Sequence, residues 1–191
     1  MAYIGKQPTA VPLTSSDLED GIITSAKLAA GVGGKVLQVV NQFYDTQTST
    51  TGTSFVDTGL TANITPSSTS NKILASFYPS ISGLNNSYVA FKMFRDSTEI
   101  GSSTNTGTGI ECFMGFSFKD EGNLTYSAPV FPLVHLDSPS TTSQITYKLQ
   151  FSPMRTTASF TCILNRSYNI GDDNQFRSSS RLVLMEIAGW L

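Results

Sequence analysis

The sequence contains few charged residues, one histidine and two cysteines. Charged residues make up 14% of the 191 positions, and 12 Lys and Arg against 14 Asp and Glu give a net charge of −2. The basic residues are scattered, so no basic stripe is available to neutralise phosphates. The composition therefore argues against nucleic acid as a partner.

Long apolar runs are also missing from the sequence. The stretch 180–187 is among the longest and contains Arg181, whereas a span of the bilayer needs roughly 20 apolar residues. Residues 1–6 lack the apolar core of a signal peptide. We therefore expect no membrane insertion, and we expect assembly in the cytoplasm with export only as part of something larger.

The scarcity of histidine and cysteine limits catalysis and metal binding. A serine-type triad would need His135 beside a nucleophile and an orienting carboxylate, and with serine so abundant a nominal nucleophile carries no signal. One histidine and two distant cysteines do not form a zinc site. We expect no enzyme, metal or cofactor, and a structural or interface role for His135.

The two cysteines, Cys112 and Cys162, fall on the apolar faces of expected strands. A free thiol in such a position behaves as a small hydrophobic side chain, so we expect buried free thiols. A disulfide across the sheets is the alternative that the sequence leaves open.

Residues 1–34 differ in composition from the rest of the chain. Apolar residues come singly or in pairs between Ser, Thr and Asp, so no segment can close a core of its own. We expect an extended arm with one or two short helical turns, such as residues 26–30 capped by Thr24 or Ser25. The arm would anchor the protein to a partner through Pro12, Leu13, Leu18, Ile22, Ile23 and Leu28.

From Lys35 onward the apolar residues alternate with polar ones, and roughly a quarter of the chain is Ser or Thr. Eight to ten short strands separated by turns, with no long helix, predict an all-β domain over 35–191. Two packed antiparallel sheets forming a β-sandwich, specifically a jelly roll, are the expected architecture.

Individual strands can be placed within this domain. The first, residues 36–43, is expected to be buried on both faces near its start. Residues 55–64 are expected to form either two short strands or one strand bent at Gly59, and another strand is expected over 110–118. The clearest hairpin joins 88–95 to 98–101 through a tight turn at Asp96.

Two groups of polar or aromatic residues are candidates for binding. The loop containing Asp172, Asp173 and Asn174 offers oxygen ligands that calcium or a glycan would use, although solvated turns use the same residues. Aromatic residues on outward strand faces mark either a subunit interface or the core; these are Tyr44, Tyr78, Tyr88 and Phe113.

Several segments together resemble a known family. The arm over 12–30, with its core Ser-Ser-Asp-Leu-Glu-Asp-Gly-Ile-Ile-Thr-Ser-Ala-Lys-Leu, resembles N-terminal and stalk segments of tail-fibre and related virion proteins of bacteriophages, particularly marine and cyanobacterial ones. The domain is similar to such proteins in further short segments, which occur in the same order: 56–60, 94–98, 137–139, 145–148, 165–167 and 184–189. The resemblance covers most of the chain.

The resemblance implies a homotrimeric structural protein located in the virion. Its jelly rolls would pack around a threefold axis, as in complement-type and tumour-necrosis-factor-type domains. Residues 1–34 would bind other virion proteins, capsid or tail, and the domain would be a knob for host attachment, with a host-surface glycan as a candidate ligand. The family supplies no catalytic residues.

Alternatives remain within and outside this class. Fibre stalks often repeat the Asp-Gly-Ile-Ile-Thr-type unit, which occurs once here, at 20–24; a short spike, a head fibre or a capsid decoration (cement) protein fits better than a long shaft. The hypothesis from another class is a glycan depolymerase tailspike with Asp172, Asp173 or Glu186 as acids. In that case Glu186, in an otherwise apolar strand, would be the place for a raised pKa.

Overall fold

The computed structural model describes residues 35–84, 87–104, 107–118, 127–154, 160–169 and 176–189. The predicted arm, with its anchoring residues and helical turns, and the loop at 172–174 lie outside the described residues. The described part of the chain contains strands and no helix: β1 Val36–Tyr44, β2 Thr48–Thr51, β3 Val56–Ile64, β4 Lys72–Tyr78, β5 Ile81–Gly83, β6 Tyr88–Arg95, β7 Thr98–Ile100, β8 Met114–Ser117, β9 Leu133–Asp137, β10 Ile145–Pro153, β11 Thr161–Leu164 and β12 Ser180–Ile187.

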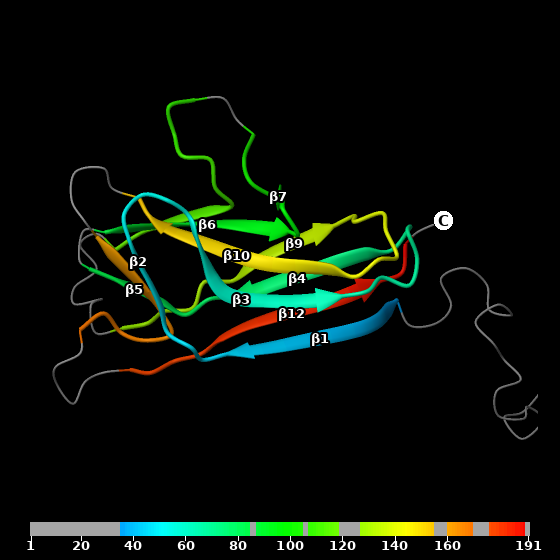
Figure 1. Cartoon of the computed structure of the whole chain (residues 1–191), viewed down its shortest axis with the longest axis horizontal. Coiled ribbons are helices and arrows are strands. Elements are labelled where there is room, and N and C mark those ends of the chain that lie inside the picture. The colour runs from blue at the N-terminus through cyan, green and yellow to red at the C-terminus, as the bar shows by residue number, and fades with distance from the viewer. Residues whose placement is uncertain are drawn as a thin grey trace, which may run out of the picture. The chain divides into compact units, whose positions relative to one another are not determined.

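The strands form two large sheets and one small one, and all their pairings are antiparallel. One large sheet has the order β1-β12-β4-β9. The other has the order β3-β10-β6, with β7 and β8 both paired to β6. The three-stranded sheet β2-β11-β5 lies at one end of the two large sheets, where Figure 1 shows β2 and β5.

The chain passes between the large sheets by way of the small one. Three segments of the chain, β1-β2-β3, β4-β5-β6 and β10-β11-β12, each contribute one strand to every sheet. In each sheet the strand from the third segment lies between the strands from the other two. This is the strand order of a jelly roll, with a short middle sheet at the corner. The predicted antiparallel β-sandwich is confirmed.

The core lies between the large sheets and follows from alternation along the strands. In β3, Leu60, Ala62 and Ile64 are buried while Thr61 and Asn63 face solvent. Other strands of both large sheets supply the largest fully buried side chains: Phe77 in β4, Phe91 in β6, and Tyr147 and Phe151 in β10. Because side chains on a strand point alternately to opposite faces, each large sheet has one buried face and one outer face.

Residues 56–64 form one strand, β3, that bends at Gly59, which is one of the two arrangements that the sequence left open. The φ of Gly59 is +87°, a left-handed conformation that glycine adopts without strain. The register between β3 and β10 shifts at this point, between the partners of Lys148 and Gln150, which marks a β-bulge. The ring of Tyr44 occupies the space where a Cβ of residue 59 would lie.

The predicted hairpin is also confirmed. Asp96 turns the chain between β6 and β7 with a φ of 52°, and Arg95 pairs with Thr98. The turn is fixed to β10, because the Asp96 amide donates to the Thr146 carbonyl at 2.7 Å and Asp96 Oδ1 accepts from the Thr146 amide at 2.9 Å.

Two strand predictions were wrong. The start of β1 is not buried on both faces: β1 is an edge strand, and Val36, Leu37 and Val39 are about half exposed. The strand expected over 110–118 is limited to β8, so Cys112 lies before it and is half-buried. Both cysteines are free thiols, and burial raises the pKa of Cys162 to about 12.

Candidate functional site

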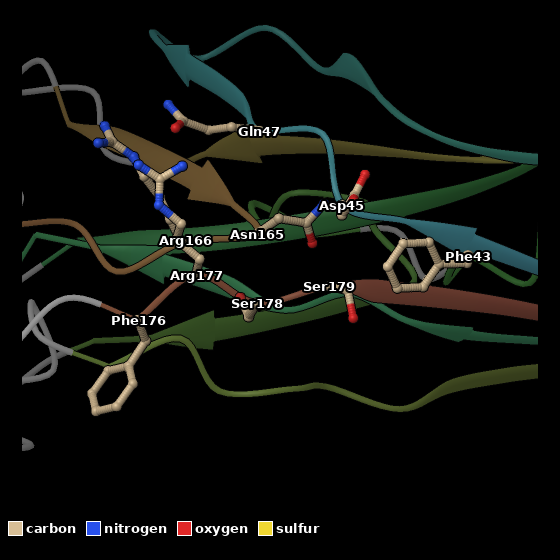
Figure 2. A pocket seen from close by; sticks show the side chains of 9 residues that line it. All are labelled: Phe43, Asp45, Gln47, Asn165, Arg166, Phe176, Arg177, Ser178 and Ser179. Atoms are coloured by element: carbon tan, nitrogen blue, oxygen red, sulfur yellow. The ribbon is translucent and has the colours of Figure 1, made fainter.

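The main cavity of interest lies at the end of the sandwich where β1 and β11 stop and β12 begins. It has a volume of about 440 Å³. Its lining combines two arginines with aromatic, amide, hydroxyl and carboxylate side chains, which are shown in Figure 2: Phe43, Asp45, Gln47, Asn165, Arg166, Phe176, Arg177, Ser178 and Ser179.

Asn165 holds the cavity wall together. It is 3% exposed, and its φ of 66° is left-handed, a conformation that asparagine tolerates better than most residues. Its side-chain amide donates to the carbonyls of Tyr44 at 3.0 Å and Thr46 at 2.8 Å, and its Oδ1 accepts from the Ser180 hydroxyl at 2.6 Å. One buried side chain thus connects the ends of β1 and β11 to the start of β12.

Beyond Asn165 the chain forms a short two-stranded ladder that pairs Arg166 with Arg177. The Ser167 amide donates to the Phe176 carbonyl at 2.9 Å, and the Ser178 amide donates to the Asn165 carbonyl at 3.0 Å. These hydrogen bonds lie on either side of the arginines, so Arg166 and Arg177 themselves are a non-hydrogen-bonded pair. Facing side chains come closest in such a pair. Figure 2 shows both side chains directed to the same end of the cavity.

The positive charge of this pair is uncompensated within the described residues. Neither arginine forms an ion pair with another described residue. The Nε of Arg166 is buried and has no hydrogen-bond partner among these residues. Like charges directly opposite in a ladder are destabilising, so the pair favours an anion between or beside the two guanidinium groups.

The rest of the lining is amphipathic. Phe176 is 60% exposed and Phe43 is 47% exposed, and the Arg181 guanidinium lies over one face of the Phe43 ring. Asp45 adds a hydrogen-bond acceptor and Gln47 adds an amide to the lining. The lining thus combines positive charge, hydrogen-bonding groups and apolar surface.

A second feature is the outer face of the sheet β1-β12-β4-β9, called here the outer apolar face. Antiparallel partners point to the same side, and the register aligns two rows across all four strands. One row is apolar throughout and the next contains two polar residues: Val39, Met185, Leu74 and Leu136, then Asn41, Val183, Ser76 and Val134. Val39, Val134 and Leu136 are about half exposed.

The charged residues of this face lie at its two ends. Lys72 pairs with Ile187 at one end, and Arg181 lies between Phe43 and Tyr78 at the other. The guanidinium carbon of Arg181 is 4.2 Å from the centroid of the Phe43 ring, a cation–π contact. An apolar centre with a polar rim is the usual anatomy of a protein interface.

The outer face of the other large sheet has the opposite character. Asp57 accepts hydrogen bonds from Lys148 Nζ at 3.1 Å and from Gln150 Nε2 at 2.8 Å. The Thr146 hydroxyl donates to the Asn63 side chain at 2.8 Å. The polar groups of this face satisfy one another, so the two faces of the sandwich differ in what they can bind.

Glu186, the candidate acid of the depolymerase hypothesis, has an environment that contradicts a raised pKa. It is 1% exposed, and its carboxylate accepts from Ser67 N at 2.6 Å, Ser67 Oγ at 2.7 Å, Asn71 Nδ2 at 2.6 Å and Gln38 Nε2 at 2.6 Å. Burial alone would raise its pKa, but these hydrogen bonds outweigh burial and hold the pKa below the ordinary 4.5. Glu186 therefore fastens β1 and the loop before β4 to β12, and it does not present a proton to a substrate.

The other predicted residues have separate positions. His135 contacts the Phe113 ring edge-on, with centroids 6.3 Å apart, in keeping with its predicted structural role. Tyr44 and Phe113 pack against the core, and Tyr78 lies on the outer apolar face. In the described part of the chain, His, Cys, Asp and Glu nowhere gather in threes that could hold a metal ion.

The sequence did not predict the arginine pair, and only the polar loop beside it, with Asp172, Asp173 and Asn174, was a candidate for binding. Asp172, Asp173 and Asn174 lie outside the described residues, but Phe176 and Arg177, which line the cavity, follow that loop directly. An arginine on each side of a predicted loop was the available signal. No membrane-crossing helix occurs among the residues that the structure describes.

No protein family profile and no curated protein matches the sequence. Among solved structures, the chain is similar to the VP2 subviral particle of infectious bursal disease virus, with a TM-score of 0.37 and 11% identity over 80% of this chain and 37% of that one. For the structure of the Gt strain of that virus the TM-score is 0.34 and the identity 9%, over 81% and 39% of the chains. This chain spans less than half of the viral chains it matches, and the similarity is too distant to assign a function.

Proposed function

We propose that the chain is a structural protein of a bacteriophage virion, a homotrimeric fibre or spike whose jelly-roll domain is a knob for host-surface binding. Residues 1–34 anchor it to capsid or tail proteins. Its action is binding, and it is not an enzyme. This proposal joins the resemblance of the arm and domain segments to the surface properties of the folded domain.

The observation that carries the proposal is the outer apolar face. One apolar row across four strands and a second row that is half apolar leave Val39, Val134 and Leu136 in water in the isolated chain, and monomers rarely keep large apolar patches exposed. Neighbouring copies of the chain are suitable partners for the uncharged centre of this face, because subunit interfaces of homo-oligomers are more apolar than free surface. The polar outer face of the other sheet then points to solvent.

A capsid decoration protein is the alternative in the same class. It would use the same domain to bridge neighbouring capsomers, and the outer apolar face would then cover a capsid protein. The depolymerase hypothesis is weaker, because the lowered pKa of Glu186 removes one of its three candidate acids.

Light scattering on the full-length protein separated by size-exclusion chromatography tests the assembly. We expect three times the 20.6 kDa of the chain. A monomer that persists at high protein concentration would contradict the trimer and would favour the decoration protein.

Anchoring is tested in the full chain by Ile22→Asp combined with Ile23→Asp. We expect an unchanged trimer that no longer joins phage particles during assembly, since the two residues are an adjacent apolar pair among the expected anchoring residues. Normal incorporation of this variant would contradict anchoring by residues 1–34.

A further inference from the structure

We propose that the cavity at the end of the sandwich binds an acidic saccharide, with its carboxylate on Arg166 and Arg177 and its hydroxyls near Asp45 and Gln47. The inference rests on the proposed function, because a knob that meets a host surface needs a ligand site, and it names the chemical class of that ligand. It stands on the charges and packing of described residues.

The arginine pair supplies the first reason. Arg166 and Arg177 occupy facing positions at the closest register of an antiparallel ladder, and neither has an ionic partner among the described residues. Two adjacent guanidinium groups repel one another, and a carboxylate that accepts from both relieves the repulsion. The planar guanidinium group matches the two oxygens of a carboxylate, which makes such pairs geometrically specific.

The rigidity of the wall supplies the second reason. Every polar atom of the Asn165 side chain is satisfied, and Ser80 Oγ donates to Ser178 Oγ at 2.7 Å behind the ladder. The Arg166 carbonyl accepts from Ser82 Oγ at 2.7 Å. The backbone that carries the arginines is therefore held before a ligand arrives, which lowers the entropic cost of binding.

The remaining lining selects a saccharide over a simple anion. The exposed ring of Phe176 offers an apolar surface on which the C–H face of a sugar can pack, and Phe43, whose ring has Arg181 over one face, adds to the apolar lining. Asp45 repels a second negative charge but accepts hydrogen bonds from hydroxyls. A volume of about 440 Å³ lies within the usual range for small-molecule sites, and inorganic phosphate would leave most of it unfilled.

Isothermal titration calorimetry with matched sugar pairs tests the inference. The probes are 3′-sialyllactose with lactose, trigalacturonate with cellotriose, and inorganic phosphate. We expect at least one acidic saccharide to bind at least tenfold more tightly than its neutral counterpart and than phosphate. Binding should weaken with added salt, because it depends on charge.

Arg166→Gln and Arg177→Gln should each lower the affinity for that saccharide at least tenfold. Lys148→Gln is the matched control, since it removes one positive charge from the opposite sheet and should change the affinity less than twofold. A purely structural role for the arginines predicts lower thermal stability of their variants, whereas relief of repulsion predicts an unchanged or higher Tm in the absence of sugar.

Several results would overturn the inference. The first is that no acidic saccharide binds detectably. The second is that a neutral sugar or phosphate binds as tightly as the acidic saccharide. The third is that both arginine variants keep the full affinity for the acidic saccharide. Light scattering on the same samples separates the proposals, because a trimer that binds no sugar contradicts only the ligand.

Discussion

The Tyr147 hydroxyl donates a hydrogen bond of 2.7 Å to Oδ2 of Asp137 inside the sandwich, joining the two large sheets through polar atoms. Burial, with the hydrogen bond to Asp137 and its negative charge as smaller causes, raises the pKa of Tyr147 above its ordinary 10.0, so the phenol stays a donor. Arg95 completes the group, with Nη1 at 2.8 Å and 2.7 Å from the two oxygens of Asp137.

The first prediction concerns this group. Arg95→Met should reduce the free energy of unfolding by about 3–5 kcal/mol, because it leaves the buried Asp137 without its counterion. Tyr147→Phe should cost less, about 1–2 kcal/mol, because the arginine remains. Urea unfolding followed by circular dichroism measures both. As a control, Arg95→Met with Asp137→Leu should lose less stability than Arg95→Met alone; an equal or larger loss would contradict the assignment of the cost to the unpaired carboxylate.

The second prediction concerns the pH dependence of stability. The folded-state pKa of Glu186 lies below 4.5, so its stabilising effect is complete above about pH 4.5 and is lost as the pH falls through the lowered value. Glu186→Gln should cost about 1–3 kcal/mol at pH 7, because an amide cannot accept from all four donors. The difference from the unmodified protein should shrink at pH 3.

Thermal unfolding between pH 7 and pH 3 measures this convergence. Glu99 is a useful comparison, since its pKa is also lowered but it lies nearer to solvent and is paired with Lys92 at 2.7 Å. Its change to Gln should have a smaller effect at pH 7. Parallel pH profiles for Glu186→Gln and the unmodified protein would show that Glu186 does not supply the acid sensitivity.

Features of the fold that depend on residues close together in the sequence could be predicted from it. The turn at Asp96 and the bend at Gly59 are local chemistry, and the number and alternation of strands are sufficient to predict a sandwich. The small sheet β2-β11-β5 was not predicted, because it pairs strands from three distant parts of the chain. Whether β1 is covered by another strand is likewise a property of the whole fold, which is why its exposure was missed.

In the candidate site, too, local features could be predicted from the sequence and pairings between distant residues could not. A polar loop near residue 172 could be predicted from composition, but the pairing of Arg166 with Arg177 depends on the register of a ladder closed across that loop. The outer apolar face arises from four strands that are far apart in sequence, of which β4 and β12 looked like ordinary core strands. Alternation identifies two faces on each strand, and only the assembled sheet decides which one water reaches.

The third prediction concerns Gly59. Gly59→Ala should destabilise the domain by more than the roughly 1–2 kcal/mol of a left-handed alanine, because the new Cβ would also displace the Tyr44 ring. Chemical unfolding measures the loss. Gly115→Ala is the matched control, since the nearest atoms to its Cβ would be 3.9 Å away, and it should be neutral or slightly stabilising. Equal effects of the two changes would contradict the proposed cause.

The fourth prediction tests the outer apolar face as the subunit interface. Leu136→Asp should convert the proposed trimer to monomers without unfolding them, because Leu136 is half exposed in the single chain and a carboxylate there is tolerated in water but not in an apolar interface. Thr61→Asp is the control on the other sheet, opposite Lys148, and should leave the assembly intact. Light scattering reports the mass and circular dichroism the fold. A trimer that survives Leu136→Asp would place the interface elsewhere, and a variant that unfolds would show that Leu136 supports the domain itself.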